Sequence, residues 1–334
     1  MSSIAVTCGL IILVLLVIML LAGVPIAVAL AVSSIAAILP VLNTGAAVLT
    51  GAQRIFSGIS VFSLLAIPFF ILAGNLMNKG GIAIRLINFA KLFTGRIPGA
   101  LAHTNAVANM LFGAISGSGT AAASAMGSII GPIEEEEGYD RDFSAAANIA
   151  TAPTGLLIPP SNVMITYSLV SGGTSVAALF MAGYIPGILM GVGSMVVAFI
   201  YAKKHKYPTS GKTPMKEALK VTLEAIPSLL LIIIVIGGIV AGIFTATEGA
   251  GICVLYCLIL SVCYRSITVK SFMKILVSSA CTSGIILFLI SASSAMSFVM
   301  AYSGIPAAIS NGIMSISTNK YVIFFLMNVI LMVV

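Results

Sequence analysis

The chain has 334 residues, of which 60% are hydrophobic and 7% charged, and its net charge is +7. A soluble domain carries roughly 25% charged residues, so this composition excludes a soluble globular protein. The cations gather in a few short loops, as the positive-inside bias of membrane proteins produces, and we expect no nucleic-acid partner. Long apolar runs, rather than short alternating strands, predict an all-α polytopic membrane protein embedded in a lipid bilayer.

Apolar runs suited to crossing a membrane recur along the chain, and a full span needs roughly 20 residues. The runs, of which the second is short, are Ile4–Ala22, Ile26–Leu39, Gly58–Met77, Val176–Tyr201, Ile226–Phe244, Gly249–Val262 and Ser283–Tyr302, with one more beginning near Tyr321. No cleavage site follows the first run, so we expect a retained span and not a signal peptide. The amphipathic segment Leu86–Phe93 predicts an interfacial helix.

Basic loops predict which ends of the spans face the cytoplasm. One loop contains most of the lysines: Lys203, Lys204, Lys206, Lys212, Lys216 and Lys220. Counting spans back from this loop places Glu134–Asp142 on the same side, and the basic segment Lys79–Arg96 belongs there too. Pro98–Ile133 must then enter and leave on one face, which predicts a helical hairpin with Ser116–Thr120 at its tip. A polar tip is tolerated at membrane depth only inside protein, so we expect a re-entrant hairpin.

The hairpin tip, Ser116–Thr120, combines glycines with hydroxyl side chains inside apolar sequence. Hydroxyl groups, and carbonyl groups released from helical pairing, are the oxygen ligands that a hard cation such as Na⁺ requires. The half-helix that begins at Thr120 directs unpaired N–H groups toward the tip, and such an end favours an anion. One place can therefore hold a cation and a carboxylate. Tight packing of small residues between helices is the structural alternative.

The second interruption, Thr154–Asn162, contains the adjacent prolines Pro159–Pro160. These prolines remove two N–H donors and force the preceding backbone to be extended. We expect the helix that starts at Phe143 to unwind here and to restart near Ser161 or Asn162, both suitable N-caps. An ordinary proline kink is the alternative. A hairpin tip and a discontinuous helix are together typical of a secondary-transporter site.

The remaining polar residues fit structural roles better than functional ones. We expect the acidic run Glu134–Glu137 to be a solvated helix end, Glu248 to be an interfacial residue and His103 to make a helix-packing hydrogen bond. The five cysteines lack metal-ligand or disulfide spacing and are expected to be small packing or lipid-facing residues. Gly113–Gly117 loosely resembles the serine loop of an intramembrane protease, but no later intramembrane histidine follows it. We therefore expect no enzyme.

A weak internal repeat is visible in the sequence. Three residues recur 223 positions later, where Met77, Gly81 and Ile82 match Met300, Gly304 and Ile305. Transporters are often built from two inverted repeats with the site between them. By this offset a second hairpin tip would fall at about position 339, beyond Val334. We therefore expect one complete half-site, the start of another, and a C-terminally truncated version of a longer protein.

Several motifs together resemble one known family. They are Gly-Ala-Ile-Ser-Gly-Ser-Gly at 113–119, Glu-Gly-Tyr-Asp-Arg-Asp-Phe-Ser-Ala-Ala at 137–146, Leu-Ile-Pro-Pro-Ser at 157–161, and the segments 67–74, 179–187 and 242–249. In this order, and from Val24 to Val334, the chain resembles the large membrane subunit of tripartite ATP-independent periplasmic (TRAP) transporters.

The resemblance implies an inverted-repeat, elevator-type secondary transporter in the bacterial inner membrane. It implies Na⁺ as the coupling ion with no other cofactor, a small four-helix membrane subunit, and a periplasmic binding protein that delivers an organic acid. The Thr154–Asn162 variant favours a sugar acid such as sialic acid over a C4-dicarboxylate. A stand-alone Na⁺/anion symporter and a non-transporting membrane scaffold are the alternatives.

Carried over residue by residue, the resemblance implies a Na⁺ site and a substrate site. The Na⁺ ligands are expected at Ser116, Ser118, Gly155, Ile158 and Pro160. Substrate contacts are expected at Gly117, Gly119, Thr120, Thr154, Ser161 and Asn162. The chain departs from many relatives at 121–123, where three alanines replace an acidic residue.

We expect a single transmembrane domain, 1–334, with four parts. Residues 1–97 form N-terminal spans and an interfacial arm helix, and 98–173 form the re-entrant hairpin and broken helix. Residues 174–265 form scaffold-type spans with the cytoplasmic loop 203–220. Residues 266–334 begin the second repeat, whose hairpin is incomplete.

Overall fold

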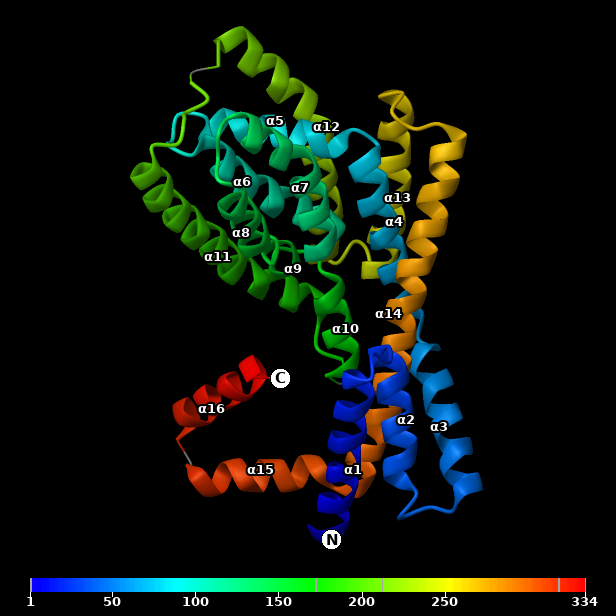
Figure 1. Ribbon diagram of the computed structural model, residues 1–334. Coiled ribbons are helices and arrows are strands. Elements are labelled where there is room, and N and C mark those ends of the chain that lie inside the picture. The colour runs from blue at the N-terminus through cyan, green and yellow to red at the C-terminus, as the bar shows by residue number, and fades with distance from the viewer. Residues whose placement is uncertain (1, 172, 212, 318, 334) are drawn as a thin grey trace. The chain divides into compact units, whose positions relative to one another are not determined.

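The computed structural model describes residues 2–171, 173–211, 213–317 and 319–333, so Lys212 of the predicted basic loop lies outside the described residues. Within the described residues, all regular structure is helical and no strand occurs. This confirms the predicted all-α class. The chain divides into two compact units, which are described separately (Figure 1).

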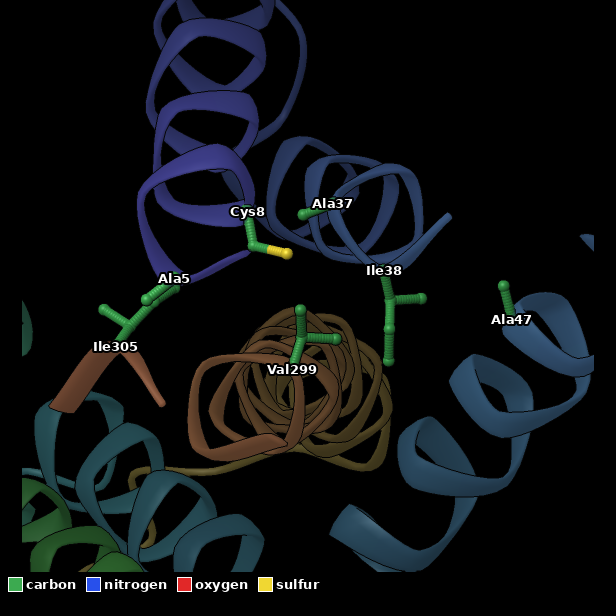
Figure 2. Close-up of a cluster of buried hydrophobic side chains, with 7 residues drawn as sticks. All are labelled: Ala5, Cys8, Ala37, Ile38, Ala47, Val299 and Ile305. Atoms are coloured by element: carbon green, nitrogen blue, oxygen red, sulfur yellow. The ribbon is translucent and has the colours of Figure 1, made fainter. Parts of the chain in front are cut away.

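Unit 1 comprises Met1–Val61 and Gly284–Val334. Its helices are α1 (Ser2–Leu21), α2 (Ile26–Ile38), α3 (Thr44–Ile59), the second part of α14 (Val269–Ser303), α15 (Ile305–Ile316) and α16 (Lys320–Val333). Figure 2 shows Val299 of α14 facing Cys8 of α1 and Ile38 of α2. Most of this cluster is small, which lets membrane helices approach closely.

Unit 2, Phe62–Ser283, contains both interruptions. Its elements are the 3₁₀ turn η1 (Phe62–Leu65), α4 (Ala66–Lys79), α5 (Ile82–Thr94), α6 (Ala100–Ser116), α7 (Gly119–Glu136), α8 (Arg141–Thr151), α9 (Thr154–Leu157), α10 (Asn162–Val170), α11 (Val176–His205), α12 (Met215–Val240), α13 (Ala246–Cys263) and the first part of α14.

Six segments among the described residues are long and apolar enough to cross a membrane. They are Ile4–Leu21, Phe62–Lys79, Val176–His205, Met215–Val240, Ala246–Cys263 and Val269–Ser303. They match the predicted runs with two changes. The run predicted from Gly58 is divided, because α3 ends at Ile59 and the span begins at Phe62. Helix α12 begins at Met215, so Lys216 and Lys220 lie on a helix and not in a loop.

Helices α6 and α7 form the predicted hairpin (Figure 1). Its feet are bonded to the loop that follows α11. The N–H of Gly99 donates to the carbonyl of Pro208 at 3.2 Å, and the N–H of Asp140 donates to the Tyr207 hydroxyl at 3.1 Å. Both feet therefore lie at the end of unit 2 that carries the basic loop, as loop charge predicted.

The repeated residues occupy similar local positions in the chain. Gly81 joins α4 to α5 with φ 77° and ψ 7°, and Gly304 joins α14 to α15 with φ 77° and ψ 14°. Only glycine adopts this left-handed conformation without strain. The shared geometry supports the repeat at these two junctions, and the longer repeat stays a prediction.

The cysteines behave as expected. Cys8, Cys253 and Cys257 are buried, Cys263 and Cys281 are exposed, and all five are free thiols. Small, weakly polar thiols pack well in apolar surroundings. The described residues contain no group of three or more His, Cys, Asp or Glu side chains that could hold a metal ion.

Candidate functional site

The hairpin turns sharply at two residues. Helix α6 ends at Gly117, whose φ of 62° and ψ of 18° are left-handed, the usual geometry of a glycine helix end. Ser118 is extended and caps α7, because its hydroxyl accepts the N–H of Ala121 at 3.3 Å. The Ser118 and Thr120 hydroxyls lie 3.1 Å apart. The sequence Ser-Gly-Ser-Gly thus ends one helix and starts the next with a minimal connection.

The second interruption is a broken helix, as predicted. Helix α8 stops at Thr151, a single further turn forms α9, and the backbone is extended at Ile158 with φ −80° and ψ 122°. The Pro159–Pro160 peptide bond is cis. The chain becomes helical again at α10, where the Ser161 hydroxyl accepts the N–H of Met164 at 3.4 Å. The short helix α9 was not expected from the sequence.

The tip and the break are packed directly against each other. The N–H of Asn162 donates to the carbonyl of Gly117 at 3.3 Å. A Cβ atom on Gly113 would overlap the Cα atom of Gly155, and one on Gly117 would lie 2.8 Å from the Pro160 carbonyl oxygen. The backbones therefore approach as closely as glycine permits, and the two interruptions form one site.

Proline leaves carbonyl oxygens free beside the tip. In a continuous helix the carbonyls of Gly155 and Leu156 would accept from positions 159 and 160, but both are prolines and lack an N–H. The Ser118 carbonyl oxygen lies 3.7 Å from the position that a Gly155 Cβ would occupy. The Ser116 hydroxyl lies 3.5 Å from the same carbonyl. Oxygens from both interruptions therefore converge, and oxygen ligands suit a hard cation.

Two helices also begin at this place, and both N-termini favour negative charge. Thr120 is exposed in the first turn of α7. Asn162 opens α10, is 9% exposed, and its Oδ1 atom has no hydrogen-bond partner among the described residues. A carboxylate and a cation can therefore be held close together.

The other predicted site residues are engaged in the fold. Thr154 is fully buried and its hydroxyl donates to the Thr151 carbonyl at 2.6 Å. Ser161 is fully buried as the α10 cap, and Gly119 is buried against Ala152. These contacts give each residue a structural role, and a direct contact with substrate stays a prediction for each.

A buried amide network was missed by the sequence interpretation. The Asn109 side chain donates to Asn105 Oδ1 and to Thr151 Oγ1, each at 2.8 Å. The Asn148 side chain donates to the Ala123 carbonyl at 2.8 Å. These bonds tie α6, α7 and α8 together below the tip. Two asparagines four residues apart lie on one helix face, and that spacing was the available signal.

Glu134 corrects the expectation that the acidic run is wholly solvated. The side chain is 1% exposed, whereas Glu135 and Glu136 are exposed. Glu134 follows Met126 and Ile130 at intervals of four, so it lies on the buried stripe of α7. The sequence carried this signal, but the charged neighbours concealed it.

Two other polar residues divide differently. Glu248 lies at a helix start as expected, where it forms a capping box with Thr245. Its carboxylate accepts the Thr245 N–H at 2.8 Å. His103 is buried beside Phe199, and neither ring nitrogen makes a hydrogen bond of normal geometry with the described residues. The packing hydrogen bond expected of His103 was therefore wrong.

Comparison with known proteins agrees with this architecture. Residues 13–334 match the family model described as the tripartite ATP-independent periplasmic transporter, DctM component. Over 317 residues the chain is 51% identical to a Salmonella typhimurium protein named YgiK, covering 95% of this chain and 73% of the relative.

Two relatives carry functional names. The sialic acid TRAP transporter large permease protein SiaM of Vibrio cholerae is 36% identical over 94% of this chain and 73% of its own length. The C4-dicarboxylate TRAP transporter large permease protein DctM of Rhodobacter capsulatus is 35% identical over 95% and 75%. These relatives are permeases and not enzymes. The chain therefore belongs to the DctM family of TRAP transporters, as a large, multi-pass subunit of the inner membrane.

Proposed function

We propose that the chain is the permease of a Na⁺-coupled secondary transporter that moves an organic acid by an elevator-type movement. The observation that carries the proposal is the contact between the hairpin tip and the broken helix, marked by the 3.3 Å bond between Asn162 and Gly117. Discontinuous helices that meet a hairpin tip provide both ion ligands and helix N-termini.

The proposed Na⁺ ligands are oxygens of the five predicted residues. The hydroxyl groups of Ser116 and Ser118 come from the tip, and carbonyl groups come from Gly155, Ile158 and Pro160. Support comes from the burial of Ser116, which is 1% exposed, and from the prolines that leave the Gly155 carbonyl without a helical donor. A buried oxygen without a donor is costly, and a bound cation removes that cost.

The proposed substrate is a carboxylate, held by the first N–H groups of α7 and α10. Sialic acid and C4-dicarboxylates, the substrates named for two relatives, both carry this group. Their permeases are 36% and 35% identical to this chain, so identity favours neither. We retain a sugar acid as the first candidate and a dicarboxylate as the second.

A pocket beyond the far end of α10 supports delivery from the periplasm. It has a volume of about 340 Å³ and includes Ser168, Ser175, Thr245 and Thr247. These residues lie where α10 ends and where α11 and α13 begin, opposite the basic end of α11. We propose that a periplasmic binding protein releases its organic acid toward this side, and that a small four-helix subunit completes the membrane complex.

The test is uptake by the reconstituted complex of permease, small subunit and binding protein. The double variant Ser116→Ala plus Ser118→Ala removes two proposed ligands, and we expect at least about a tenfold rise in the Na⁺ concentration for half-maximal uptake. Ser128→Ala, on the exposed face of α7, is the matched control and should leave uptake unchanged.

Two outcomes would contradict the proposal. Unchanged Na⁺ dependence in the double variant would remove the assigned site and would favour a scaffold role for the tip. Full uptake without any binding protein would favour a stand-alone Na⁺/anion symporter.

A further inference from the structure

We propose that the pocket between α7 and α8 at the cytoplasmic end of the hairpin is a second cation site, which binds a monovalent cation, Na⁺ or K⁺, through Glu134 and Ser144. This pocket has a volume of about 300 Å³. It is separate from the hairpin tip, because Glu134 lies in the last turn of α7 and the tip precedes the first. The inference does not depend on the transport mechanism proposed above.

Two buried oxygens in this pocket have no partner. Glu134 is 1% exposed and Ser144 is 9% exposed, and both side chains line the pocket. Neither Glu134 Oε1 nor Ser144 Oγ makes a hydrogen bond of normal geometry with the described residues. The two groups are nevertheless close enough for the hydroxyl to affect the carboxyl. Buried polar atoms are nearly always satisfied, so a ligand between them is expected.

The charge of the pocket favours one positive charge. Its lining contains the carboxylates of Glu134 and Glu135 and the guanidinium of Arg141, which together give −1. Arg141 is exposed at the start of α8, so its charge is well solvated, whereas that of Glu134 is not. A single buried carboxylate beside a hydroxyl provides the hard oxygen ligands that alkali cations bind, and one such ion would neutralise the lining.

The surroundings of Glu134 offer it no other counter-charge. The ionisable groups whose charges act on it or lie in its pocket are Glu135, Glu137, Tyr139, Arg141 and Tyr207. Most of these groups are acidic. Burial, chiefly, and repulsion by Glu137 raise the pKa of Glu134 to about 7, and the Ser144 hydroxyl opposes this. Burying such a carboxylate without a partner is unfavourable, and a bound cation offsets that cost.

The pocket also has room for an ion because glycine lines it. Gly127 and Gly131 face it from α7, and Asn148 closes its inner end by donating to the Ala123 carbonyl. No atom lies within 4 Å of the position that a Gly131 Cβ would occupy. An oxygen-lined space therefore begins at Glu134 and ends at Asn148.

The test measures stabilisation by Na⁺ and by K⁺ in the purified complex at pH 8, with choline chloride holding ionic strength constant. The background carries Ser116→Ala plus Ser118→Ala, so that the tip site does not contribute. We expect the melting temperature still to rise with Na⁺ or K⁺. Glu134→Gln and Ser144→Ala should each require at least about tenfold more cation for the same rise.

Glu136→Gln is the matched control, because it removes the same charge from an exposed position on the same helix. It should leave the cation response unchanged. Equal responses in Glu134→Gln and in the background protein would overturn the proposal, as would the absence of any response to either ion. Binding of radioactive sodium by the same proteins gives a second measurement that does not depend on how a variant unfolds.

Discussion

At the scale of single residues, Glu134 occupies a position that an apolar side chain would normally fill. It continues the stripe of Met126 and Ile130 into the last turn of α7. Its burial disfavours the charged form and raises its pKa to about 7. The folded protein therefore holds a proton at this residue over a pH range in which the unfolded chain has released it.

The stability of the protein should fall as pH rises through this range. The folded pKa of about 7 exceeds the model value of 4.5, so the native state binds more protons between them. Stability is lost from about pH 4.5 to about 7, by at most about 3 kcal/mol. In buffer without Na⁺ or K⁺, Glu134→Gln should remove this loss and melt at a higher temperature at pH 8. Melting temperature against pH, with Glu136→Gln as control, measures the effect, and identical profiles for Glu134→Gln and wild type would contradict it.

At the scale of helices, the contact of α6 with α9 brings the two interruptions together. Gly113 and Gly155 allow it because any side chain on Gly113 would overlap the opposing backbone. The neighbouring bond between Asn162 and Gly117 then fixes the start of α10 against the tip. Small residues at a helix crossing thus position the free carbonyl groups.

Gly113→Ala should separate these helices. An added methyl group forces backbone movement, which typically costs about 1–3 kcal/mol. We expect a lower melting temperature and weaker Na⁺ dependence together, since the strain falls on the site itself. Gly131→Ala is the control, because its methyl group would meet no atom within 4 Å. A Gly113→Ala protein that is as stable as this control would show that the two helices are less closely packed.

The sequence predicted the elements of the site better than their contacts. Proline chemistry was sufficient for the break before Ser161, because a missing N–H is a local property. The pairing of Gly113 with Gly155 and the network around Asn109 depend on which helices meet, and no local pattern specifies that. Glu134 was predicted to be solvated because neighbouring charges outweighed its place on the apolar stripe.

At the scale of the whole molecule, charge in one loop predicted the sidedness of the hairpin. The structure adds the bonds that hold the feet to that loop, from Gly99 to Pro208 and from Asp140 to Tyr207. Aromatic stacking reinforces the junction, since the rings of Tyr139 and Tyr207 lie 4.5 Å apart. Hairpin and loop therefore share one side of the membrane.

Cysteine labelling in a cysteine-free variant tests this arrangement. Glu136→Cys lies at a hairpin foot, Ser210→Cys in the basic loop and Val170→Cys at the far end of α10, and all three positions are exposed. Because basic loops remain in the cytoplasm, a membrane-impermeant thiol reagent should reach the first two only in inverted vesicles. It should reach Val170→Cys only from the periplasmic side. Labelling of Glu136→Cys and Ser210→Cys from opposite sides would mean that the hairpin crosses the membrane, and the proposed cytoplasmic cation site would then lie on the wrong face.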